Sequence, residues 1–138
     1  MKAHDFFKDL LTVDLAPDEI IRGVQFAPVR AAAYAKLHHR ASHYAVVGVA
    51  AALEMSNGRI RVARIGLTGA ASHAIRLTNV EEALAGQVLS METVDAAARP
   101  AGSDLKDING DIHGSKDYRR AMIPVFTRRA LKGALARA

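Results

Sequence analysis

A three-residue polar turn is the feature of this sequence that most restricts its fold. Ser56-Asn57-Gly58 separates an almost wholly apolar segment, residues 44–55, from residues 59–69, which begin with a polar–apolar alternation. Asn and Gly accept the positive φ angles that a two-residue type I′ turn requires. The alanines of the first segment by themselves favour a helix. The turn and the alternation together nevertheless predict an antiparallel hairpin over the two segments.

Strand-like patterns also occur inside and before this hairpin. The alternation in its second arm changes phase between Val62 and Ile65, which predicts a bulge or a strand covered on both faces. Residues 20–27 read as a further strand, with apolar side chains on one face and Pro28 directly after it. Residues 29–43 are ambiguous, because three consecutive alanines favour a helix while the next four residues alternate like a strand before a polar loop.

Three helices are predicted after the hairpin. The sequence TNVE at residues 78–81 matches a capping box, and the helix that it begins is expected to run through Leu84 and to end at Gly86. Residues 90–98 form the second predicted helix. Ser115 is the expected N-cap of a long third helix, because its hydroxyl can accept a hydrogen bond from the first turn.

The third predicted helix carries an apolar stripe and an internal proline. Pro124 lacks an N–H and clashes with the preceding turn, so we expect a kink there. The side chains expected to form the buried stripe are Tyr118, Met122, Val125, Phe126 and Leu131. Strands followed by helices predict an α+β fold, with an antiparallel sheet of three to four strands followed by three helices packed on one face.

Length and composition fit a single folded domain. The chain has 138 residues, of which 50% are hydrophobic and 24% charged, typical of a globular protein that buries a core. The chain contains no cysteine, which excludes disulfides, thiolate zinc sites and cysteine-ligated clusters within it and fits a reducing, cytoplasmic location. We find no targeting signal. The longest apolar run, residues 44–53, is too short to cross a bilayer, so no membrane partner is expected.

The positive charge of the chain is concentrated near its C-terminus. Residues 116–138 contain seven basic residues and one acid, a net charge of +6, whereas the other 115 residues are nearly neutral. One hypothesis is therefore a stand-alone interaction module that binds an acidic partner or nucleic acid through this helix. Nucleic acid is the less favoured partner, because no aromatic residues are interleaved with the arginines for base stacking.

Two clusters resemble ligand sites without completing one. His38, His39 and His43 are close in sequence, but no carboxylate follows at a matching spacing, so we interpret them as polar loop residues rather than a metal site. The segment 66–70 is glycine-rich and follows a strand, yet it lacks the spacing of a phosphate-binding loop. Such glycines more often let a strand end pass close to another backbone. No catalytic residue and no metal ligand is predicted.

Four stretches of the chain, taken in order, resemble a known family. They are Phe6-Phe7 with Thr12–Leu15, Pro17–Ile21 and Pro28; Tyr34-Ala35-Lys36 with Arg40 and Val47–Ala50; Val62–Leu67 with Gly69, Ala70, Arg76, Glu81-Glu82, Leu84 and Gly86; and Asp111-Ile112 with Ser115, Tyr118-Arg119-Arg120 and Arg129–Leu131. Together they look like the C-terminal domain of the FAD-binding, or medium, subunit of the carbon monoxide dehydrogenase and xanthine dehydrogenase (molybdenum hydroxylase) family.

This resemblance implies a role in an oxidoreductase complex without catalysis by the chain alone. The complete assembly would pass electrons from a molybdenum centre in the large subunit, through the [2Fe–2S] clusters of the small subunit, to FAD. The domain would scaffold the complex and help to cover the flavin. FAD is implied for the complete subunit, whereas the isolated chain is expected to bind none. The residues implied near the isoalloxazine ring are Tyr34 and Lys36, with Arg40, Ser42 and His43 as neighbours.

The resemblance also implies that the chain divides into two parts. At several positions the sequence differs from the family. Residues 1–28 would be a connector with the first strand, and residues 29–138 the C-terminal-like domain. The family's glycine-rich flavin-binding domain, which would come upstream, has no counterpart in this sequence. His43 stands where the family has Asp, Ala70 stands where it has a second glycine, and the family's arginine after Asp111-Ile112 is absent.

Overall fold

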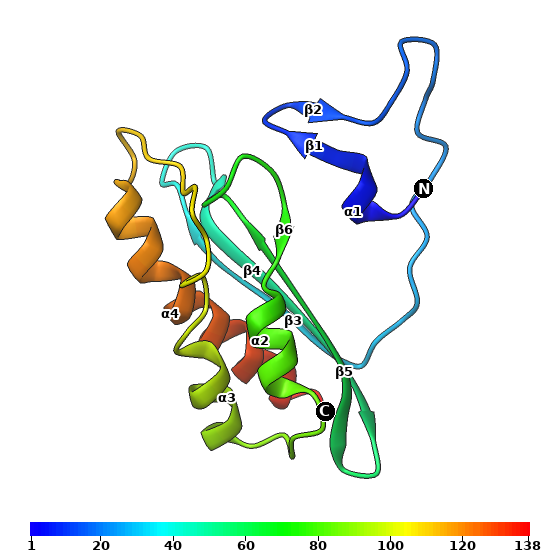
Figure 1. Cartoon of the computed structure of the whole chain (residues 1–138), viewed down its shortest axis with the longest axis vertical. Coiled ribbons are helices and arrows are strands. Elements are labelled where there is room, and N and C mark those ends of the chain that lie inside the picture. The colour runs from blue at the N-terminus through cyan, green and yellow to red at the C-terminus, as the bar shows by residue number, and fades with distance from the viewer.

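A four-stranded antiparallel sheet with three helices on one face forms the body of the molecule (Figure 1). The computed structural model describes all residues, 1–138. The strand order in the sheet is β3-β4-β5-β6, and a small second sheet pairs β1 with β2. The elements are α1 (Ala3–Phe6), β1 (Phe7–Asp9), β2 (Thr12–Val13), β3 (Ala31–His38), β4 (Ala45–Ser56), β5 (Arg59–Thr68), β6 (Ile75–Arg76), α2 (Thr78–Leu84), α3 (Met91–Ala98) and α4 (Lys116–Leu135).

The predicted hairpin is present as β4 and β5. Asn57 and Gly58 have φ angles of 50° and 73°, as a type I′ turn requires. The bulge suggested by the change of phase also exists, but it lies earlier than expected, at Arg61. Glu54 pairs with Val62 and the next residue along β4 pairs with Ile60. The extra residue on β5 lets Ile60 and Ala63, three residues apart in sequence, both reach the buried face.

The ambiguous segment before the hairpin is a strand. Ala31–His38 pairs with β4 along its length, so the alternation over residues 34–37 was the better guide than the run of alanines. The predicted strand over residues 20–27 is wrong, because this segment has no strand partner and the side chains of Ile20, Val24 and Phe26 are exposed. Two-residue β6 completes the sheet in its place. Alternation by itself does not stabilise a strand whose main-chain groups have no neighbour.

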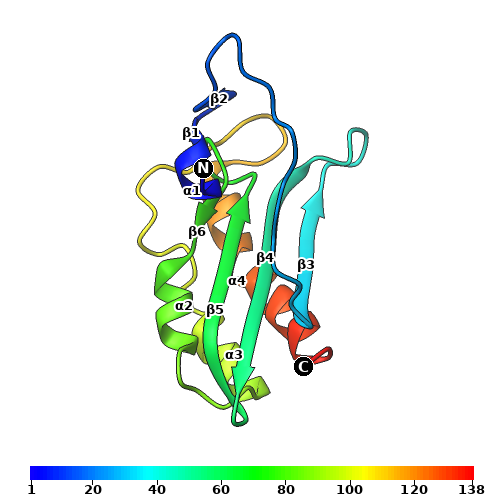
Figure 2. The same cartoon turned by 90° about the vertical axis from the view of Figure 1, so that its right-hand side faces the viewer.

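The N-terminal segment stands apart from the body. In Figure 1 it lies on the side of the sheet away from the helices, and in Figure 2 it descends in front of β4 to the start of β3. It contains α1, β1 and β2, and its large apolar side chains are mostly exposed. Phe6 and Phe7 contact each other edge to face, 5.2 Å apart, rather than the core.

All three predicted helices are present, with α2 running from Thr78 to Leu84 as predicted, and two of the three begin with a side-chain N-cap. The hydroxyl of Ser90 accepts a hydrogen bond from Thr93 N–H at 3.2 Å, and the hydroxyl of Ser115 accepts one from Tyr118 N–H at 3.1 Å. The capping box of the first helix is wrong, because α2 begins without a side-chain cap. The carboxylate that would have completed the box, that of Glu81, instead accepts a hydrogen bond from Ile65 N–H of β5.

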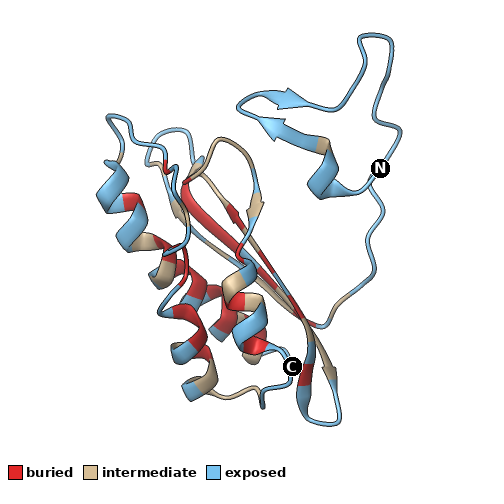
Figure 3. Ribbon diagram, viewed as in Figure 1, coloured by how far each residue is buried: buried red, intermediate tan, exposed pale blue.

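The core lies between the sheet and the helices, as the buried ribbon in Figure 3 shows. Helix α4 packs against β3 and β4, whereas α2 packs against β5. The predicted stripe of α4 is partly wrong. Tyr118 and Val125 are 45% and 37% exposed. The face turned inward is instead made by Arg119, Ile123, Phe126, Thr127, Ala130, Leu131 and Ala134. The helix runs through Pro124 as one element of 20 residues.

Candidate functional site

The face of the sheet that the helices do not cover is the candidate site, and we call it the open face. It is turned toward the viewer in Figure 2. The strand register arranges its side chains in rows across β3, β4, β5 and β6. The residues of the open face are Ala32, Tyr34, Lys36, Gly48, Ala50, Ala52, Arg64, Gly66, Thr68 and Arg76. Most of them are small, so the face is flat between a few long side chains.

Tyr34 lies across the open face rather than in the core. Its side chain leaves β3 and passes over Gly48 of β4, where a Cβ atom would lie 3.1 Å from the tyrosine Cζ and closer still to the hydroxyl. Gly48 therefore leaves the space that the tyrosine ring occupies. Tyr34 remains 54% exposed. Partial burial raises the pKa of Tyr34 above its ordinary value, so the phenol is neutral at physiological pH and keeps its O–H donor.

Lys36 is held by the loop that joins β3 to β4. Its ammonium donates a hydrogen bond to the main-chain oxygen of His43 at 2.8 Å. His43 adopts a φ of +58°, which turns this loop back toward β3, and its ring stacks on that of His38 at 5.3 Å. An ammonium has three N–H donors, so Lys36 keeps donors for another acceptor.

The other residues predicted near the site lie in the same loop. Ser42 donates its main-chain N–H to Nδ1 of His39 at 3.1 Å, and its hydroxyl lies 2.9 Å from the same nitrogen. Arg40 is exposed in the turn. The structure thus brings Lys36 together with the loop of Ser42 and His43, and leaves Tyr34 one row further along β3. No group of three His, Asp or Glu side chains is arranged to hold a metal ion.

A shallow depression of about 400 Å³ lies on the open face, and its lining includes Ala50, the strand partner of Tyr34. Its floor is made by small residues of the sheet, and two guanidinium groups border it. Arg64 donates to Glu54 at 2.5 Å, and this hydrogen bond holds the pKa of Glu54 below its ordinary value. Arg76 pairs with Glu81. Carboxylates therefore hold both guanidinium groups at the border of the depression.

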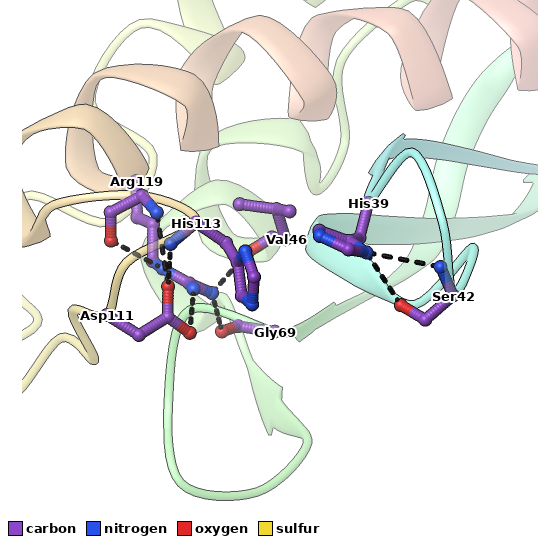
Figure 4. A network of polar contacts seen from close by, with 8 residues as sticks. His39, Ser42, Val46, Gly69, Asp111, His113 and Arg119 are labelled. Carbon is purple, nitrogen blue, oxygen red and sulfur yellow. Dashed lines mark hydrogen bonds and ion pairs between the residues drawn. The ribbon is translucent and has the colours of Figure 1, made fainter.

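A buried arginine near the loop was not anticipated from the sequence. Arg119, at the start of α4, is 4% exposed and donates to main-chain oxygens of β4 and of the β5–β6 connection (Figure 4). In the sequence it counted as one of the seven basic residues of the C-terminal segment. The available signal was spacing, because Arg119 is four residues before Ile123 and seven before Phe126, which are both buried.

Four other arginines in α4 or just after it also make contacts within the chain. Arg120 donates to Leu105 O at 3.1 Å, Arg128 donates to Asp95 at 2.6 Å, and Arg137 donates to Ala32 O at 2.6 Å. The guanidinium of Arg129 lies over the ring of Phe126, 4.7 Å from its centroid. Five of the seven basic residues behind the local charge of +6 thus contact other parts of the chain, and nothing in the structure favours the interaction module.

Comparison with known proteins places this fold in a family. The family model described as the CO dehydrogenase flavoprotein C-terminal domain matches residues 32–134. The chain belongs to this family. The solved structure titled reconstituted CO dehydrogenase from Oligotropha carboxidovorans superposes with a TM-score of 0.83 at 29% identity, over 97% of this chain and 48% of that one.

Two curated relatives extend the match beyond the family model. The nicotine 6-hydroxylase medium subunit of Paenarthrobacter nicotinovorans is 34% identical over 99% of this flavoprotein-domain chain and 48% of its own length. The carbon monoxide dehydrogenase medium chain of Hydrogenophaga pseudoflava is 32% identical over 98% of this chain and 48% of its own length. The chain thus spans about half the length of the curated relatives it matches. None of its helices is both long enough and apolar enough to span a membrane.

Proposed function

We propose that this chain acts as the C-terminal part of the medium subunit of a molybdenum hydroxylase-type oxidoreductase, with its open face toward the flavin. The observation that carries the proposal is the arrangement of Tyr34 and Lys36 on a sheet face that no helix covers and that has a floor of small residues. FAD would be the cofactor of the complete subunit. In that subunit, FAD would supply the redox chemistry, with Tyr34 and Lys36 of this chain beside its ring system.

The residues of the open face fit a planar, partly anionic group. Small side chains at Ala50 and Gly66 let a flat ring system approach the sheet, and Tyr34 offers an exposed aromatic surface beside them. Lys36 lies one row away, with N–H donors left after its bond to His43 O. The ammonium of Lys36 would favour negative charge on a reduced flavin ring. Its hydrogen bond to His43 O fixes the position of this ammonium.

The open face supplies one wall of a site, and the chain alone is proposed to hold no flavin. The depression on this face is open and shallow, whereas a dinucleotide needs a cleft that buries most of its surface. We propose that an FAD-binding part of the subunit covers this face. The same part would also cover the exposed apolar side chains of residues 10–26. The small [2Fe–2S] and large molybdenum subunits would complete the assembly.

A chimera tests this proposal. The chain replaces the matching half of the Hydrogenophaga pseudoflava medium chain, and FAD binding and the flavin reduction potential are measured in the product. Tyr34→Ala should weaken FAD binding about 3–10-fold through loss of an aromatic contact. Lys36→Met should lower the two-electron reduction potential by about 5–20 mV, the equivalent of a partly exposed ion pair.

Matched variants on the helical side provide the controls. Tyr118→Ala and Lys132→Met remove the same side-chain types from exposed positions of α4, and both should leave flavin affinity and potential unchanged. Equal effects in the open-face variants and in these controls would refute the assignment. Submicromolar FAD binding by the chain alone would refute the part of the proposal that requires a second wall.

A further inference from the structure

Arg119 uses nearly all of its hydrogen-bonding capacity at one end of the sheet. Its Nη1 donates to Val46 O at 2.9 Å and to Gly69 O at 2.7 Å, its Nε donates to Gly114 O at 3.2 Å, and its Nη2 pairs with the Asp111 carboxylate at 2.7 Å. The side chain is 5% exposed. One guanidinium thus joins the start of α4 to three other segments (Figure 4).

Two of these acceptors lie where the β4–β5 ladder has ended. The last paired residues are Gly48 and Thr68, so Val46 and Gly69 lie beyond them. Gly69 has a φ of +83° and passes so close to β4 that an added Cβ would lie 2.8 Å from Val46 O. Arg119 therefore replaces the missing ladder bonds and fixes the first residues of β4, directly after the loop that holds Lys36.

A second connection from Arg119 reaches the same loop through Asp111. One carboxylate oxygen of Asp111 accepts from Arg119, and the other accepts from His113 N–H at 2.8 Å and Gly114 N–H at 3.1 Å. This closes a tight turn and directs the ring of His113 against that of His39, 4.2 Å away.

The ring of His39 in turn determines the shape of the β3–β4 loop. Its Nδ1 accepts the main-chain N–H of Ser42, and its main-chain oxygen accepts the N–H of His43 at 2.9 Å. His43 O then receives the ammonium of Lys36. An unbroken series of contacts therefore leads from the guanidinium on α4 to the cation of the open face.

We infer that Arg119 is a positioning residue for the β3–β4 loop, and through it for Lys36 on the open face. The inference about the loop stands on the contacts alone, whereas its consequence for a flavin rests on the proposed function. A lysine at position 119 cannot substitute, because an ammonium offers three donors from one point rather than five in a planar fork. The loop would lose at least one of its two connections.

Amide hydrogen exchange of the full chain tests the inference without any cofactor. Arg119→Lys should raise exchange at the amides of His39, Ser42 and His43 by about tenfold or more, since local opening governs exchange there. The matched control is Arg120→Lys, which also removes bonds to main-chain oxygens, those of Gly102 and Leu105, at the next residue of α4. It should leave the three loop amides unchanged.

Asp111→Asn distinguishes a local effect on the loop from a general loss of folding. Asp111 is half-exposed, so this variant weakens the second connection and leaves the core intact. It should raise exchange at the same three amides by a smaller factor, with the amides of α3 unchanged. Uniform acceleration in the core and loop, or equal loop exchange in Arg119→Lys and Arg120→Lys, would overturn the inference.

The flavin-loaded chimera separates this inference from the proposed function. If Lys36→Met shifts the flavin potential, Arg119→Lys should shift it in the same direction. A potential that responds to Lys36→Met but not to Arg119→Lys overturns the consequence for the open face. A potential that responds to neither, with altered loop exchange, overturns the proposed function and supports the positioning of the loop.

Discussion

Replacing Gly69 by alanine tests the close approach of β5 to β4 at the end of the sheet. A left-handed φ such as the +83° of Gly69 costs an alanine about 1–2 kcal/mol. The new Cβ would also lie 2.8 Å from Val46 O and closer to Ala45 O, which are main-chain atoms that cannot turn aside. Moving Val46 O weakens its bond from Arg119, which adds about 1–2 kcal/mol. We therefore expect a loss of about 2–4 kcal/mol.

Urea unfolding measures this loss, with Gly66→Ala as the matched control. Gly66 lies three residues earlier, inside β5, has no positive φ and has nothing within 4 Å of an added Cβ. Its replacement should be neutral or slightly stabilising. With a denaturant slope of about 2 kcal/mol/M, Gly69→Ala should lower the midpoint by about 1–2 M. A midpoint within about 0.3 M of that of the control would show that the strand ends have room for a side chain, contrary to the structure.

Two further perturbations address buried and charged groups. The Thr127 hydroxyl is buried without a hydrogen-bond partner, so Thr127→Val should stabilise the fold by about 1 kcal/mol in the same assay, and a loss of stability would indicate an unseen partner. The hydrogen bond from Arg119 holds the pKa of Asp111 below its ordinary value, so its contribution is present above the unfolded pKa and is lost as pH falls through the folded pKa. The stability difference between the natural chain and Asp111→Asn should therefore be constant near neutral pH and begin to shrink below about pH 4, the unfolded pKa of an aspartate. A difference that grows as the solution is acidified would contradict this.

Local chemistry made part of the fold predictable. The turn at Asn57 and Gly58 requires φ angles that few residues adopt, so it located the hairpin without tertiary information. Ser90 and Ser115 likewise act within their own helical turns. These features depend on residues close in sequence, and the structure has them where they were expected.

The wrong predictions share a dependence on distant partners. Residues 20–27 alternate like a strand but have no neighbouring strand, and the Glu81 carboxylate turns from its own helix to Ile65 N–H of β5. Arg119 was missed because its acceptors, Val46 O and Gly69 O, are 73 and 50 residues away in sequence. A charged side chain becomes a buried one only when the fold assembles enough oxygens around it.

On the open face, too, the sequence predicted some features, and contacts between distant residues determined the others. The resemblance singled out Tyr34 and Lys36, and their alternation on one strand placed them on a common face. The space left by Gly48 for the tyrosine ring and the bond from Lys36 to His43 O came only from the register of β3 on β4 and from the left-handed turn of the loop.

The bond from Arg137 to Ala32 O has a consequence for solubility. β3 is an edge strand, and unpaired main-chain groups along such an edge can recruit a strand from another molecule. At the opposite edge, β6 is only two residues long and offers little to pair with. Arg137 occupies one carbonyl of the long edge, and Lys36 adds a charge along it. The last turn of the chain thus hinders the self-association through strand addition that this sheet would otherwise invite.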